Sequence, residues 1–65
     1  MSITVNGECQ ELAATTIADL LTALDYESSS VAIAHNEAFV PRGQYADTAL
    51  STGDRIEIVA PMQGG

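Results

Sequence analysis

The last two residues of this chain, Gly64 and Gly65, are the ones whose type and position suggest chemistry most directly. Glycine loses more backbone freedom on ordering than any other residue, so a glycine pair is a poor anchor for a chain end. A tail without side chains can pass extended through a narrow channel and leave its last carbonyl open to attack. The alternative is a frayed terminus. We expect residues 61–65 to form a flexible reactive tail, with Gly64, Gln63 and Met62 in a partner's channel.

The Gly65 carboxylate is the working group in this interpretation. A free α-carboxyl has a pKa of about 3.3–3.7, so at neutral pH it is an anion and a poor electrophile. Another enzyme must activate it, most simply by using ATP to join it to AMP. The acyl adenylate then accepts a nucleophile: sulfur gives a thiocarboxylate, and an amine gives an amide. The chain is thus expected to be a co-substrate of partner enzymes and not an enzyme itself.

The other reactive residue types do not form a catalytic pattern. Cys9 is the only cysteine, which excludes an internal disulfide, and it is expected to be a small packing residue or a surface thiol. Strand alternation puts His35 on the same face as Val31 and Ile33, which favours a partly buried, hydrogen-bonded histidine over a ligand or base. No spacing of aspartates indicates acid–base work, and no phosphate loop or metal-ligand motif occurs. We expect no metal site and no bound cofactor.

Charge and length narrow the class of partner. Nine acidic residues face two basic ones, Arg42 and Arg55, within 65 residues, so the net charge is −7. Nucleic acids and anionic membranes are therefore poor partners, whereas a basic protein surface fits, with solubility alone as the alternative. No apolar run approaches the roughly 20 residues of a membrane span, and no signal peptide is evident. We expect one domain over residues 1–60, cytoplasmic and monomeric when free.

The elements that must position the tail follow from periodicity. Residues 1–5 and 8–12 alternate as strands around Asn6-Gly7, a strong hairpin signal. Thr16 can cap a helix over residues 17–24, whose apolar positions fall on one face. Later elements are expected in this order: a loop at 25–30, a strand at 31–35, a turn at 36–38, a short strand at 39–40, an irregular segment at 44–50, a turn at 51–54 and a last strand at 55–60.

This order predicts an α+β fold with one helix packed across a mixed sheet of four to five strands, the last strand lying between earlier ones. The alternation in the strands and the helical spacing of residues 17–24 place the large apolar residues in one layer. These residues are Ile3, Val5, Ile17, Leu20, Leu21, Leu24, Val31, Ile33, Leu50, Ile56 and Ile58. Beside the tail, Val59 should point away from that layer. Together with Ala60, Met62 and Phe39 it could form an exposed partner-binding patch. The alternative for Phe39 is that it covers the core.

Several segments together resemble the thiamine-biosynthesis sulfur carrier family, ThiS, of the ubiquitin-like β-grasp fold. The resemblance runs through the whole chain and is carried by Ile3-Thr4-Val5-Asn6-Gly7, Thr16 to Leu24, Val31 to Asn36, Val40-Pro41-Arg42, Leu50 to Val59 and Gly64-Gly65. Tyr45 stands where the family often has Trp, and His35 where it often has an aliphatic residue. Both departures concern packing and leave the tail unaffected.

The resemblance implies a cycle of sulfur transfer on the last residue. An E1-like adenylyltransferase would adenylate Gly65 with ATP, and sulfur from a cysteine desulfurase or relay protein would convert it to a thiocarboxylate. The carrier would then deliver sulfur to thiazole synthase. Three alternatives remain: a small subunit of molybdopterin synthase, a ubiquitin-like protein modifier, and a binding module whose Gly-Gly end is accidental. The final acceptor, partner affinities, docking surface and role of Cys9 stay open.

Overall fold

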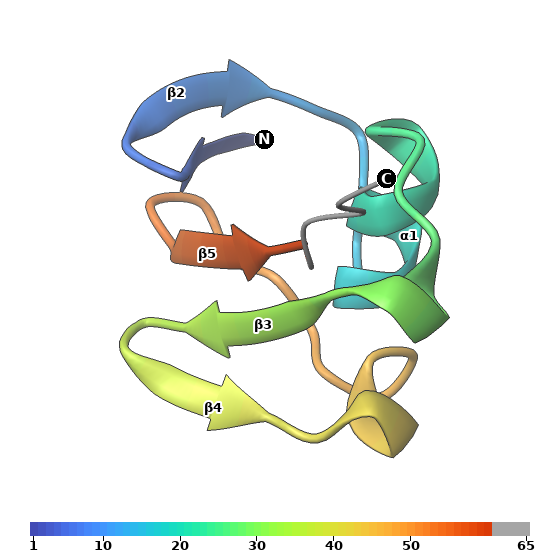
Figure 1. The fold of residues 1–65 in the computed structure, drawn as a ribbon. Helices are drawn as coiled ribbons and strands as arrows, with labels where there is room; N and C mark the ends of the chain where they lie inside the picture. Colours follow the sequence, from blue (N-terminus) through green and yellow to red (C-terminus); the bar gives the residue numbers. More distant parts are fainter. Residues whose placement is uncertain (61–65) are drawn as a thin grey trace.

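One helix and a five-stranded mixed sheet make up the fold in a computed structural model (Figure 1). The structure describes residues 1–60, so the expected tail at 61–65 lies outside the described residues. The elements are β1 (Ser2–Val5), β2 (Glu8–Glu11), α1 (Ile17–Ala23), a 3₁₀ turn η1 (Ser28–Ser30), β3 (Ala32–His35), β4 (Ala38–Val40), a 3₁₀ turn η2 (Arg42–Gln44) and β5 (Arg55–Val59).

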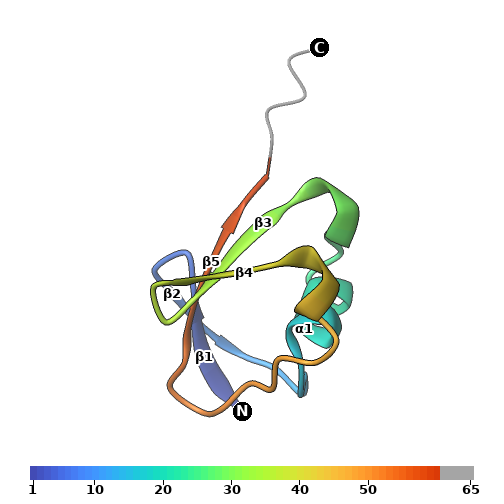
Figure 2. The same cartoon turned by 90° about the horizontal axis from the view of Figure 1, so that it is seen from below.

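The last strand occupies the centre of the sheet, as its sequence pattern predicts. The strand order is β2-β1-β5-β3-β4, with β5 parallel to β1 and antiparallel to β3. Figure 2 shows α1 on one side of the sheet, so the fold has two layers and one sheet face stays uncovered by any described helix. This arrangement confirms the expected β-grasp architecture with five strands.

Both hairpins turn through two residues with positive φ. Asn6 and Gly7 have φ of 50° and 84°, the combination that a type I′ turn requires. Asn36 and Glu37 repeat it with φ of 51° and 73°. Since the second turn takes only these two residues, β4 begins at Ala38, one residue earlier than expected.

The asparagine of each turn also binds the central strand. Asn6 accepts a hydrogen bond from the Ile58 amide at 2.8 Å and donates one to the Ile58 carbonyl at 3.2 Å. The Asn36 side-chain oxygen accepts from the Arg55 backbone amide at 2.8 Å, and the Asn36 backbone amide donates to the Arg55 carbonyl at 2.7 Å. These bonds continue the pairing of β5 where the neighbouring strands have already turned away.

The helix begins as its capping signal indicates, with one difference. The Thr16 hydroxyl accepts a hydrogen bond from the Asp19 amide at 3.1 Å, as in a capping box. In a capping box the Asp19 side chain would accept from the backbone amide of Thr16. Here it accepts instead from the hydroxyl and the backbone amide of Thr15, one residue earlier. These hydrogen bonds from Thr15 lower the pKa of the Asp19 carboxyl. The helix ends at Ala23, and Leu24 is its C-cap.

The core lies between α1 and the inner face of the sheet. Ten of the eleven residues expected there are buried, and Leu24 is the exception because it packs only partly against the cluster. Ala14, Val40 and Tyr45 are buried as well. The Tyr45 hydroxyl donates to the Val31 carbonyl at 3.1 Å, which satisfies its polar end inside an apolar layer. Tyr45 therefore anchors the irregular segment to the core.

Candidate functional site

The candidate site begins where the central strand ends. β5 has the burial alternation of a strand with one covered face: Ile56 and Ile58 are buried, whereas Glu57 and Val59 are exposed. Val59 is 65% exposed, and Ala60 after it is exposed too, so the expectation that Val59 points away from the core is confirmed. The remaining predicted site residues, Met62, Gln63, Gly64 and Gly65, lie outside the described residues.

Phe39 lies on the same uncovered face of the sheet. It is 71% exposed, which decides against the alternative that it covers the core. In the strand register Phe39 is opposite Ala34, and Val59 is opposite Ala32, so β3 separates the two large side chains. We call these four residues the outer apolar patch.

The two alanines of the outer apolar patch were not expected to be part of the site. Ala32 and Ala34 alternate with Val31 and Ile33, so the sequence pattern already placed both alanines on the outward face of the strand. Alanine has too small a side chain to indicate a contact residue by its type alone. Because both alanine side chains are small, the surface between Phe39 and Val59 lies lower than these two larger side chains. An exposed apolar surface of this kind is typical of a partner-binding site.

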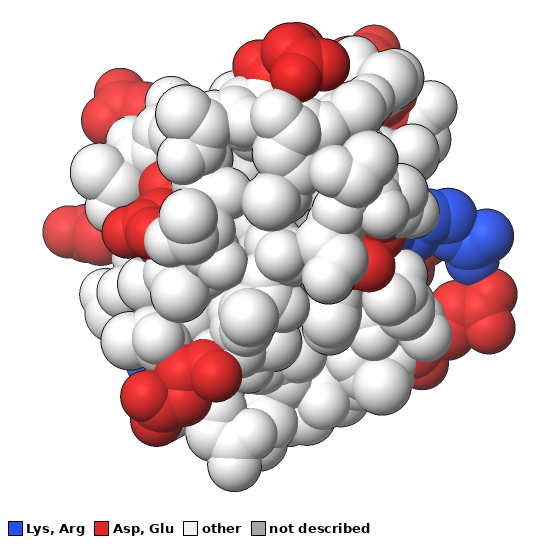
Figure 3. All heavy atoms as spheres, turned by 180° about the vertical axis from the view of Figure 1, so that it is seen from behind, with Lys and Arg blue, Asp and Glu red and all other residues white. Residues whose placement is uncertain are grey.

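An acidic side chain lies at the border of the outer apolar patch, and others are spread over the rest of the surface (Figure 3). Glu57 is opposite Ala34 in the register, at the border of the outer apolar patch. Figure 3, which shows the molecule from behind, also has acidic side chains at separate places over the surface, with basic ones only at the edge of the view. A partner with an overall basic surface would therefore meet favourable long-range attraction.

His35 belongs to a polar cluster at the opposite end of β5. Its Nε2 lies 2.7 Å from an oxygen of Asp54, and both side chains are largely covered. The same carboxylate accepts hydrogen bonds from the Ser51 amide at 2.9 Å and the Asn36 side chain at 3.2 Å. The expectation of a partly buried, hydrogen-bonded histidine is confirmed, and its distance from the tail end of β5 makes a structural role the natural one.

The environment of Asp54 changes its protonation. Burial by itself would raise the pKa of the Asp54 carboxyl, but the hydrogen bonds from His35, Ser51 and Asn36 together outweigh burial and lower it. A carboxyl whose pKa is lower in the folded protein adds stability above its unfolded pKa of about 3.9. That stability is lost as the pH falls through the folded value.

Asp54→Asn is expected to reduce the stability of the domain at neutral pH and to weaken its dependence on acid. At pH 7 the loss should be about 1–3 kcal/mol, since the amide is uncharged and has a donor NH2 group in place of one of the two oxygens that accept from His35, Ser51 and Asn36. The difference in unfolding free energy between the wild type and Asp54→Asn, measured with urea, should be smaller near pH 3 than at pH 7. Asp47→Asn, at an exposed position, is the control. A loss of the same size at both pH values would contradict this role of the carboxylate.

Other candidate chemistry is absent from residues 1–60. Cys9 is exposed, so it is a surface thiol and not a packing residue, and its sulfur lies 3.2 Å from the Ser2 hydroxyl. Within this range no group of three or more His, Cys, Asp or Glu could hold a metal ion. No helix in the described part of the chain is long and apolar enough to cross a membrane. The tail end of β5 and its surroundings remain the candidate site.

Comparison with known proteins finds similarity along nearly the whole chain. The model of the ThiS family matches residues 3–65, which includes the glycine pair. A sulfur carrier protein ThiS from Escherichia coli (strain K12) is 35% identical over the full length of both chains. The crystal structure of a thiamine biosynthesis protein (ThiS) from Geobacter metallireducens is 28% identical, covers both chains completely and superposes with a TM-score of 0.84.

A larger protein contains a similar segment. A thiazole synthase from Paramagnetospirillum magneticum is 39% identical over the whole of this chain, which spans only 20% of that protein's length. In that relative, a segment similar to this chain is therefore part of the same polypeptide as a much longer remainder.

Proposed function

The chain belongs to the ThiS family of sulfur carrier proteins, and from this premise we propose that the Gly65 carboxylate is the group that carries the sulfur. The carrier itself performs no catalysis. It serves as a co-substrate for cytoplasmic enzymes of thiamine biosynthesis, which charge its tail and then discharge it at the thiazole ring.

A single structural observation carries this proposal. The central strand β5 ends at the exposed Val59 of the outer apolar patch, the exposed Ala60 follows it, and only three residues then precede Gly64-Gly65 in the sequence. A partner that covers the patch would thus hold the chain at the point from which residues 61–65 depart. Binding energy from the patch can then position a tail that has few side chains of its own for recognition.

The chemistry needs two steps on the same carboxyl group. In the first, a carboxylate oxygen of Gly65 attacks the α-phosphorus of ATP and pyrophosphate leaves. In the second, sulfur attacks the acyl carbon and AMP leaves: hydrosulfide gives the thiocarboxylate directly, whereas a protein persulfide gives an acyl disulfide, which a thiol then reduces to release the thiocarboxylate. An E1-like adenylyltransferase would catalyse the first step, and a cysteine desulfurase or relay protein would supply the sulfur for the second.

Thiazole synthase is the proposed acceptor of the charged carrier. The thiazole synthase relative that contains a segment similar to this chain supports this partnership, because joining two interacting modules raises their effective concentration. This relative favours thiazole over molybdopterin as the final destination of the sulfur. A sulfur carrier also needs no amide bond to another protein, unlike a protein modifier.

Incubating the purified chain with the adenylyltransferase, ATP and a sulfide source tests the proposal by intact mass. The expected result is replacement of one oxygen by sulfur, located on Gly65 by fragmentation. The charged chain should then lose this sulfur when thiazole synthase and its remaining substrates are added. Amide-linked products with other proteins and no sulfur gain would contradict the proposal and support a protein modifier.

Phe39→Ala is expected to weaken binding to the adenylyltransferase by about tenfold or more while leaving the fold intact. Exposed aromatic residues at the centre of an interface commonly carry this much of the binding energy, and the side chain contributes little to the core because it is 71% exposed. Calorimetric titration measures the affinity. Tyr26→Ala, at an exposed aromatic outside the sheet, is the matched control and should bind like the wild type. Equal affinity for both variants would exclude Phe39 from the interface.

A further inference from the structure

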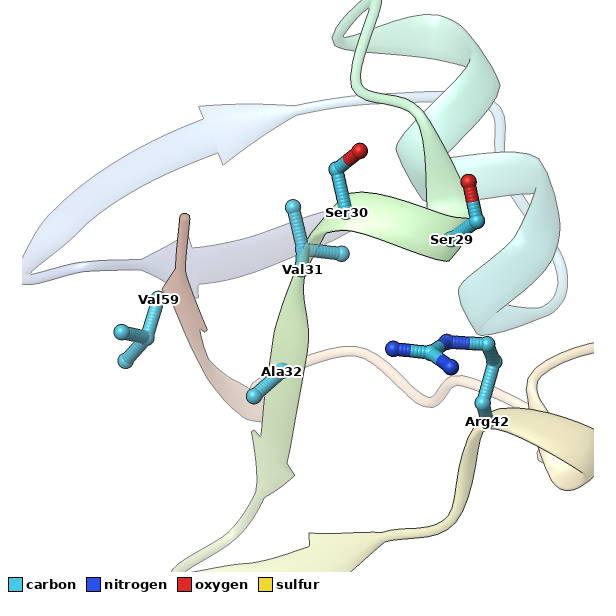
Figure 4. Close-up of a pocket in the computed structure, with 6 residues that line it drawn as sticks. All are labelled: Ser29, Ser30, Val31, Ala32, Arg42 and Val59. Carbon is cyan, nitrogen blue, oxygen red and sulfur yellow. The ribbon is translucent and has the colours of Figure 1, made fainter. Parts of the chain in front are cut away.

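A hollow lies beside the base of the tail. It has a volume of about 270 Å³ and is lined by Ser29, Ser30, Val31, Ala32, Arg42 and Val59. Figure 4 shows the Arg42 side chain extending from the start of η2 toward β3, while the Ser29 and Ser30 hydroxyls point away from its guanidinium. Three separate parts of the chain thus bring hydrogen-bond donors and apolar surface to one place.

Arg42 differs from the other basic residue of the chain. Arg55 lines a second hollow of about 330 Å³, but its guanidinium is already paired with Glu37 at 2.6 Å. Within residues 1–60 the Arg42 side chain makes no ion pair and no hydrogen bond. In a chain of net charge −7, Arg42 is therefore a cation that the described fold leaves available to a ligand.

The serines can support the same ligand. A hydroxyl donates one hydrogen bond and can rotate to suit its acceptor. Ser30 donates to a Glu27 oxygen at 3.5 Å, the outer limit of such a bond, so little is lost when it turns toward a stronger acceptor. A guanidinium presents its donors in a planar fork that matches a carboxylate.

We propose that this hollow receives an aspartate or glutamate side chain of the adenylyltransferase, with Arg42 as its ion-pair partner. This inference rests on the proposed function, because it takes that enzyme as the partner. Val59 and Ala32 line the hollow and also belong to the outer apolar patch, so one partner surface can cover both. Charge complementarity selects an acidic group at this point alone.

Such a contact would fix the orientation of docking. Elsewhere the acidic surface of the carrier repels a carboxylate, so an acidic side chain on an otherwise basic partner fits only at Arg42. In any other docking orientation the partner's carboxylate would face acidic side chains of the carrier and be repelled. This repulsion gives specificity in addition to that of the apolar contact. The orientation matters because the tail has to enter the enzyme's channel from one side.

The test compares the two arginines in binding experiments without nucleotide. Arg42→Gln and Arg55→Gln change the net charge equally, and both positions are exposed, so differences report position and not total charge. Calorimetric titration of the full chain into the adenylyltransferase should give a dissociation constant about tenfold higher for Arg42→Gln. Arg55→Gln should stay within about twofold of the wild type. Arg42→Lys should recover part of the loss, because it keeps the charge without the fork.

The outcomes separate this inference from the proposed function. Equal affinities for the two glutamine variants would overturn the inference while leaving sulfur charging, measured by mass, unaffected. A defect of Arg42→Gln that appears only in the presence of ATP would overturn it as well, since the hollow would then serve a nucleotide phosphate. Tight binding that depends on Arg42 but leads to no adenylation would support the contact and contradict the proposed function instead.

Discussion

Removing Gly65 is expected to abolish charging of the chain with sulfur while leaving its thermal stability unchanged. The deletion moves the terminal carboxylate back by one residue, about 3.3–3.6 Å along an extended chain. Since a displacement of about 1 Å can cost on the order of a hundredfold in rate, adenylation should fall by at least that factor. Stability should persist because every residue of the described core lies between Ile3 and Ile58.

AMP–pyrophosphate exchange and intact mass measure this effect, and the melting temperature controls for folding. A second variant with one glycine added after Gly65 tests the same point from the other direction, since it also moves the carboxylate by one residue. Both variants should bind the adenylyltransferase, because the outer apolar patch is unchanged. Charging of the shortened chain at the wild-type rate would show that the carboxylate of Gly65 is not the working group.

Leu21→Ala is expected to destabilise the domain by about 2–5 kcal/mol, the usual cost of deleting a large buried aliphatic side chain. Leu21 lies on the inner face of α1 and is only 1% exposed. A domain of 65 residues has a total stability of roughly 3–10 kcal/mol, so this single change could unfold most of the population at 37 °C.

Leu24→Ala is the matched control for that measurement, because it removes the same atoms from the same helix. Leu24 is the C-cap and only partly buried, so the loss should be clearly smaller. Urea unfolding followed by circular dichroism gives both free energies. Equal losses at the two positions would contradict the assignment of the inner helix face.

Local signals in the sequence were sufficient for most of the fold. Asn6-Gly7 specified its turn because both residues accept positive φ, and Thr16 marked the helix start. The exact start of β4 was missed because Glu37 adopts φ of 73°, a conformation that its residue type does not suggest. Its side chain pairs with Arg55 across the sheet end, a contact between residues far apart in sequence that periodicity cannot reveal.

The site was only partly predictable for a related reason. Val59 and Phe39 were found because large apolar residues at the outward positions of strands are conspicuous. Ala32 and Arg42 became part of a surface only once the order of the strands was known. Arg42 follows β4 whereas Val59 ends β5, and the hollow between them depends on β3 lying between those two strands.

The central position of β5 also has a consequence for how the protein is made. β5 is the last described strand to be synthesised, and it must enter between β1 and β3, whose facing edges stay unpaired until then. Its pairing with β1 closes a loop of about 50 residues, which slows folding relative to local contacts. A nascent chain therefore cannot complete its sheet until residues 55–59 have left the ribosome. Residues 61–65, which include the carboxylate proposed to be the working group, follow in the sequence, so every described strand has been synthesised before that group can be charged.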